Sequence, residues 1–116
     1  PGDFSLGYNP ALPFDIESNY GTPKSFKEFI QTAHDQGFAI ILDVVYNHFG
    51  PDDLDTSLWR FDGWNENGRN GIYFYNDRRA FTPFGDRPDL GRGEVRQFIR
   101  DNALMWLEEY RIDGFR

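Results

Sequence analysis

The sequence predicts an α/β fold built on parallel strands. Two observations lead to this class. Helix-like and strand-like segments alternate along the chain, and the first strand-like segment is almost entirely apolar, as expected for a strand covered on both faces. A strand, a helix and a second strand in this order become parallel neighbours through a right-handed crossover.

The first predicted helix runs from Pro23 to about Gly37, after a segment rich in glycine and proline, residues 1–22, that is typical of a loop. Thr22 is a suitable N-cap, proline is favoured at the first helical position, and glycine is common where a helix ends. The apolar stripe of this helix has the spacing i, i+3, i+4, i+7 and consists of Phe26, Phe29, Ile30 and Ala33.

Residues 38–46 follow as the predicted buried strand. Residues 47–92 show no sustained periodicity but are rich in aromatic side chains, and ordered connections of this length are usually functional. A short strand is expected within them at 71–75. A second helix with one apolar face is predicted over 93–110, and residues 111–116 form the last strand candidate.

This order of elements fits either an open doubly wound sheet or a slice of a (β/α) barrel. A complete barrel needs about 250 residues, so a chain of 116 residues is expected to form only part of one. In both architectures, ligands bind at the carboxyl ends of the strands.

The composition narrows the class of partner. A formal charge of -7 without a basic stripe argues against duplex nucleic acid, and the absence of cysteine excludes disulfides and thiolate metal sites. No apolar run reaches the roughly 20 residues of a membrane span. Aromatic residues make up 18% of the chain, so we expect some rings to line a cleft, where sugars are natural ligands. An aromatic-rich core is the alternative.

One acidic residue lies within the predicted apolar strand. Burial of an uncompensated charge costs on the order of several kcal/mol, so Asp43 needs a partner. Arg116 is expected at the carboxyl end of the adjacent strand and is the nearest candidate. The two residues form either a structural ion pair or part of a functional site.

The histidines do not indicate a metal site, because zinc needs three or four ligands. His48 follows Asn47 at the end of the strand, where contact with a sugar hydroxyl is the more consistent role, and His34 is expected to be solvated. The motifs of serine hydrolases, dinucleotide-binding proteins and P-loop enzymes do not occur. The spacing of an EF-hand is also missing from the acidic turn formed by Asp52, Asp53 and Asp55.

Two motifs resemble signature regions of glycoside hydrolase family 13, the α-amylase superfamily: DVVYNH at 43–48 and DGFR at 113–116. The segments LGYNP at 6–10 and YGTP at 20–23 resemble the stretch that follows the second barrel strand of this family. Within the superfamily, the sequence is most similar to glycogen branching enzymes and maltooligosyltrehalose trehalohydrolases.

The resemblance covers essentially the whole chain and implies a fragment of a (β/α)8 TIM barrel, from the end of strand 2 through strand 4. Residues 1–116 would be one partial catalytic domain, and 49–92 would be a loop insertion after strand 3. The larger rings of this insertion would either stack on glucose units or pack against the barrel. They are Trp59, Trp64, Tyr73 and Tyr75.

The resemblance further implies a retaining enzyme that acts on α-1,4-linked glucans. By matching position, Asp43 would brace the catalytic centre, His48 would bind sugar hydroxyls, and Arg116 would lower the pKa of the nucleophilic carboxylate. Tyr8 would stack on the sugar at the cleavage subsite. Asn47 matches a position where α-amylases often bind structural Ca²⁺, an ion that branching enzymes usually lack, so no cofactor is expected.

The three catalytic carboxylates of the family have no counterpart among the matched positions. The nucleophile is an Asp two positions after the Arg that matches Arg116, and the others follow later, so the 116-residue chain by itself is expected to be inactive. Asp113 is expected to fix the strand. A non-catalytic scaffold and a carbohydrate-binding domain are the alternatives. The sequence identifies no compartment, although the similar enzymes are usually cytoplasmic.

Overall fold

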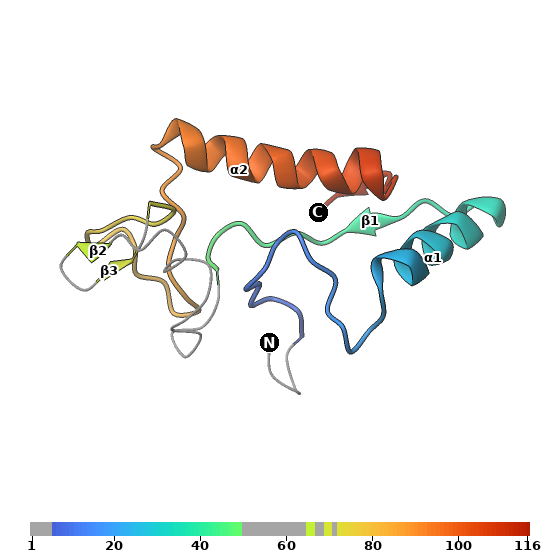
Figure 1. Ribbon diagram of the computed structural model, residues 1–116, viewed down its shortest axis with the longest axis horizontal. Helices are drawn as coiled ribbons and strands as arrows, with labels where there is room; N and C mark the ends of the chain where they lie inside the picture. Colours follow the sequence, from blue (N-terminus) through green and yellow to red (C-terminus); the bar gives the residue numbers. More distant parts are fainter. Residues whose placement is uncertain (1–5, 50–64, 67–68, 71) are drawn as a thin grey trace. The chain divides into compact units, whose positions relative to one another are not determined.

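The structure is a computed structural model that describes residues 6–49, 65–66, 69–70 and 72–116 (Figure 1). The chain divides into two compact units. Unit 1 comprises Pro1–Pro13 and Val45–Ile99, and unit 2 comprises Phe14–Val44 and Arg100–Arg116. Each unit is built from segments that lie far apart in the sequence.

Unit 2 begins its regular structure with helix α1 (Pro23–Asp35). Thr22 is the N-cap: its side-chain oxygen accepts a hydrogen bond from the Ser25 amide, and the Ser25 hydroxyl accepts one from the Thr22 amide. At the other end, Gly37 has a φ of +82°, and its amide donates to the His34 carbonyl at 2.9 Å. The predicted first helix is therefore confirmed, including both of its end signals.

Strands β1 (Ile41–Leu42) and β4 (Gly114–Phe115) pair in parallel, as the sequence predicts. Ile41 lies opposite Gly114 and Leu42 opposite Phe115. The pairing continues beyond β4, because the Arg116 amide donates to the Leu42 carbonyl at 3.0 Å and its carbonyl accepts from the Val44 amide at 3.1 Å.

The connection between the two strands contains helix α2 (Gly93–Leu104), which continues into η2 (Met105–Glu109), a turn of π-helix. The second predicted helix is confirmed, with a wider last turn than expected. The chain leaves η2 through Arg111, whose φ of +63° lies in the left-handed region. Its neighbour Ile112 donates its amide to the Trp106 carbonyl at 3.3 Å and so satisfies one of the last carbonyls of the helix.

Unit 2 has an aromatic core. The Phe26 ring of α1 lies 6.1 Å from the Trp106 ring and 5.5 Å from the Tyr110 ring, between centroids. Trp106 also satisfies its polar group, because its indole N–H donates to the buried Asn102 side-chain oxygen at 3.3 Å. The buried apolar members of this core are Ile30, Trp106, Tyr110 and Ile112.

Unit 1 is largely irregular. Its strands β2 (Asn65–Glu66) and β3 (Arg69–Asn70) are short and antiparallel. Two isolated bridges, Phe49 with Asp86 and Phe74 with Pro88, join distant parts of the unit. The core is formed by buried Phe49 and Phe74, against which Tyr46, Tyr73 and Phe98 pack.

Two strand predictions require correction. Within the predicted strand over 38–46, regular strand is limited to Ile41 and Leu42, with ladder bonds that reach from Ile40 to Val44. Phe38 and Ile41 are 63% and 59% exposed. The face of β1 that carries Ile41 is thus open, while the other face packs on the core through Ile40 and Leu42. The strand expected at 71–75 is also wrong for its described residues, 72–75, where Phe74 makes only an isolated bridge.

Candidate active site

The predicted partners Asp43 and Arg116 contact each other in unit 2. The Arg116 guanidinium donates from Nη1 to Asp43 Oδ2 at 2.6 Å. The backbone explains this contact. In a parallel ladder, the amide and carbonyl of Arg116 bond to the residues on either side of Asp43, so the two residues are register partners on one face.

The expected burial of Asp43 is not observed. The side chains of Asp43 and Arg116 are 36% and 73% exposed, because they lie on the same open face of the strand pair as Ile41. A solvent-exposed ion pair of this kind contributes at most about 1 kcal/mol to the stability of the fold. Its contribution to stability alone therefore does not account for the presence of the Asp43–Arg116 ion pair.

Unit 1 holds His48 in a buried position, with 6% of the residue exposed. Its Nε2 atom lies 2.8 Å from the Tyr8 carbonyl oxygen, and its Nδ1 atom lies 3.2 Å from Asn47 Nδ2. A carbonyl can only accept, so Nε2 carries the proton, and in the neutral ring Nδ1 accepts from the Asn47 amide.

This arrangement differs from the role that the resemblance implies for His48. Both ring nitrogens already have protein partners, so a bond from His48 to a sugar hydroxyl requires one of these partners to be exchanged. In the structure, His48 instead fixes the backbone of Tyr8, whose residue is 47% exposed.

Phe84 is a neighbour of His48 that the sequence analysis did not identify. The two ring centroids are 5.4 Å apart with an interplanar angle of 38°, and Phe84 is 59% exposed. No periodicity or motif marks this residue in the sequence. The only local signal is the Thr-Pro-Phe-Gly order, which is typical of a turn.

The chain was compared with known protein families, curated sequences and solved structures. Residues 4–56 match the family model "Alpha amylase, catalytic domain". The malto-oligosyltrehalose trehalohydrolase of Saccharolobus solfataricus is 36% identical over 119 residues. The 1,4-alpha-glucan branching enzyme GlgB of Bacillus caldolyticus is 39% identical over 119 residues.

The chain is similar to the α-amylase family along its whole length. A solved structure agrees: pullulanase type I from Bacillus subtilis, complexed with maltose, has 30% identity and a TM-score of 0.73 over 95% of this chain. The chain spans less than a fifth of these proteins, namely 19% of the trehalohydrolase, 17% of the branching enzyme and 16% of the pullulanase. It therefore corresponds to part of an α-amylase family catalytic domain.

Asp113 of the DGFR motif has the structural role that the sequence predicts. Its Oδ2 atom accepts from the Ile40 amide at 2.7 Å and lies 2.8 Å from His34 Nε2. These bonds, first from the Ile40 amide and then from His34, lower the pKa of the Asp113 carboxyl. His34 is therefore not the solvated residue expected, because the last turn of α1 brings it to the start of β4.

The rings proposed for glucose stacking have other contacts in unit 1. Tyr73 packs on Phe98 at 5.1 Å, which supports the packing alternative for this ring. The Arg79 guanidinium lies 4.3 Å from the centroid of Tyr75 and is bound by Asp77, and these bonds lower the pKa of Asp77 to about 2. Trp59 and Trp64, like the acidic turn at 52–55, lie outside the described residues.

The side-chain amide of Asn47 lies 3.2 Å from His48 Nδ1, and a calcium ion at Asn47 stays a prediction. Calcium takes six to eight oxygen ligands, and the described residues contain no group of three or more His, Asp or Glu side chains that could hold a metal. In the same part of the chain, no helix is long and apolar enough to cross a membrane.

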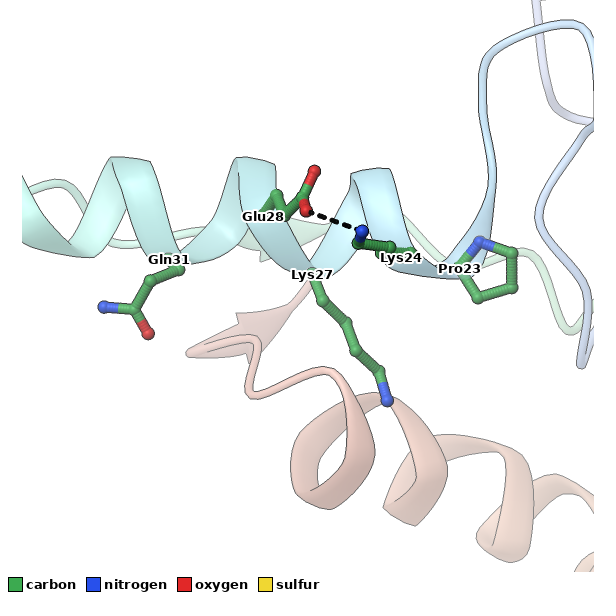
Figure 2. Close-up of a pocket in the computed structure, with 5 residues that line it drawn as sticks. All are labelled: Pro23, Lys24, Lys27, Glu28 and Gln31. Carbon is green, nitrogen blue, oxygen red and sulfur yellow. Dashed lines mark ion pairs between the residues drawn. The ribbon is translucent and has the colours of Figure 1, made fainter.

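A pocket on α1 contains none of these residues and is lined by five residues of unit 2: Pro23, Lys24, Lys27, Glu28 and Gln31 (Figure 2). Lys24 and Glu28 form an ion pair there at 3.7 Å. Lys27 pairs with Glu109 of η2 and places its Nζ atom 5.3 Å from the centroid of the Tyr110 ring. These contacts tie α1 to η2, and the pocket includes none of the predicted site residues.

Proposed function

We propose that the chain is part of a retaining enzyme that acts on α-1,4-linked glucans, of the branching-enzyme or trehalohydrolase type. Two of its relatives carry these activities in their names, and a third was solved with bound maltose. The observation that carries the proposal is the Asp43–Arg116 pair, which lies at the carboxyl ends of two parallel strands, where ligands of such sheets bind.

The charge of Arg116 is the part of this pair that bears on the proposed chemistry. A guanidinium that is 73% exposed can reach further groups, whereas a buried strut could not. Arg116 offers five N–H donors in a planar fork, of which Nη1 bonds to Asp43. Its fixed positive charge would keep a neighbouring carboxylate ionised.

Retaining glycosidases use two carboxyl groups about 5–5.5 Å apart, one as nucleophile and one as acid/base. We assign neither role to Asp43, because by matching position it braces the catalytic centre, and its Oδ2 atom accepts from Arg116 Nη1 at 2.6 Å. Asp43 instead orients the guanidinium. The catalytic carboxylates would come from parts of the protein outside these 116 residues, so the isolated chain would be inactive.

In unit 1, Tyr8 would stack on the sugar at the cleavage subsite. His48 would orient this residue through its carbonyl, and Asn47 would select the ring tautomer in which Nε2 carries the proton. A sugar hydroxyl that reaches His48 would compete with the Tyr8 carbonyl for that proton.

The experiment is product analysis of the full-length protein on amylose and on a maltooligosyl trehalose. New α-1,6 branches indicate transfer to a sugar, release of trehalose indicates hydrolysis, and conversion of either substrate supports the proposal. The isolated 116-residue chain should release no reducing sugar. If the folded full-length protein converts neither substrate, the hypothesis of an enzyme is refuted. The alternatives are then a non-catalytic scaffold and a carbohydrate-binding domain.

A further inference from the structure

Phe84 is an exposed aromatic residue of unit 1 that lies outside the motifs of the family. Exposed rings are common, and exposure by itself indicates no function. Phe84 stands out because bonds to the surrounding turn fix its backbone and because its ring contacts the buried His48.

The turn around Phe84 depends on one buried hydroxyl. Thr82 is 7% exposed, and its Oγ1 atom donates to the Gly85 carbonyl at 2.6 Å while it accepts from the Phe84 amide at 3.2 Å. Gly85 follows with a φ of +144°, which favours glycine. The backbone is thus held on both sides of Phe84.

His48 connects this turn to the segment that carries Tyr8. The imidazole packs on the Phe84 ring at 5.4 Å and bonds through Nε2 to the Tyr8 carbonyl at 2.8 Å. One buried side chain therefore contacts the backbone of Tyr8 and the ring of Phe84, two residues that are 47% and 59% exposed.

We propose that Phe84 is a stacking subsite for a glucose unit of an α-1,4-linked glucan, in addition to the unit that Tyr8 would hold. This inference rests on the proposed function. The apolar C–H face of a glucose ring packs on an aromatic ring without a directional polar group. A ring whose backbone is already fixed loses little conformational entropy when it binds.

The test is steady-state kinetics of the full-length protein on amylose with four variants. Phe84→Ala and Phe84→Leu remove the aromatic ring, and the second keeps apolar volume in case the first fails to fold. We expect both to raise KM by about five- to tenfold with kcat within about twofold of the parent protein. Phe84→Trp keeps a ring and should keep KM. Phe81→Ala removes a nearby ring that is 69% exposed and serves as the matched control.

The outcomes separate this inference from the proposed function. If the parent protein converts amylose and the ring-removing variants keep its KM, the subsite is refuted while the proposed function stands. Loss of kcat at unchanged KM would also refute it, because Phe84 would then act only through His48. A parent protein that converts no glucan would refute both.

Discussion

Units 1 and 2 position their candidate residues by different means. In unit 2, the backbone ladder of β1 and β4 makes Asp43 and Arg116 register partners, through bonds at 3.0 and 3.1 Å. In unit 1, individual side chains do this work: His48 binds the Tyr8 carbonyl, and Thr82 shapes the turn of Phe84. Site geometry in unit 2 should therefore tolerate side-chain changes nearby, whereas unit 1 should be sensitive to single substitutions.

The largest loss of stability is expected from His48→Phe. The substitution keeps a ring beside Phe84 but leaves the Tyr8 carbonyl and the Asn47 amide without their partner, at a cost of about 1–3 kcal/mol. Urea unfolding of the full-length protein measures this cost. The matched substitution His34→Phe in unit 2, where the side chain is 28% exposed, should cost less. Equal costs at the two positions would contradict the comparison.

A smaller loss is expected from Thr82→Val, which removes the buried hydroxyl that both donates to Gly85 and accepts from Phe84. The expected cost is about 1–2 kcal/mol in the free energy of unfolding. Thr32→Val is the control in unit 2, because the Thr32 hydroxyl donates to Glu28 on the exposed side of α1. A cost at Thr32 as large as at Thr82 would show that burial is not the cause.

A gain is expected from Arg111→Gly in unit 2. A non-glycine residue at a φ of +63° is strained, and glycine should stabilise the protein by about 1 kcal/mol. Gly37→Ala, at a φ of +82° after α1, should destabilise the protein by a similar amount. Calorimetric melting temperatures of the two variants should shift in opposite directions. A loss of stability on Arg111→Gly would mean that the arginine side chain contributes more than its strain costs.

The smallest effect is expected at the partly exposed Asp113. Its pKa is lowered in the folded state, so its contribution to stability is present above the unfolded pKa of about 4 and is lost as the pH falls through the folded value. The melting-temperature difference between parent and Asp113→Asn should therefore shrink when the pH is lowered from 7 to 3. His34→Ala should keep most of this dependence, because the Ile40 amide is the larger cause. A constant difference would contradict the assignment.

The same contrast explains how much the sequence could predict. Helix α1 and the Asp43–Arg116 contact follow from capping residues, apolar spacing and parallel register, which are local or periodic signals. The partners of His48 were not predictable, because contacts with Tyr8 and Phe84 join loop segments that show no periodicity. The hydrogen bond between His34 and Asp113 was missed for a related reason, since it depends on where the end of α1 meets β4.

Burial was the other quantity that the sequence misjudged. The apolar run at 38–46 predicts a strand covered on both faces, yet only the face with Ile40 and Leu42 packs on the core of unit 2. An apolar pattern indicates which side chains can be covered, and the described residues provide a cover for one face.

A double-mutant cycle on Asp43 and Arg116 tests most directly whether this pair belongs to an α-glucan active site. The variants Asp43→Asn, Arg116→Ala and their combination would be made in the full-length protein, with Arg100→Ala as a control on an exposed arginine of unit 2. We predict that each single substitution lowers kcat/KM on amylose by about 100-fold or more, and that the double variant is little worse than either. Single variants within about twofold of the parent, or losses that multiply in the double variant, would contradict the account.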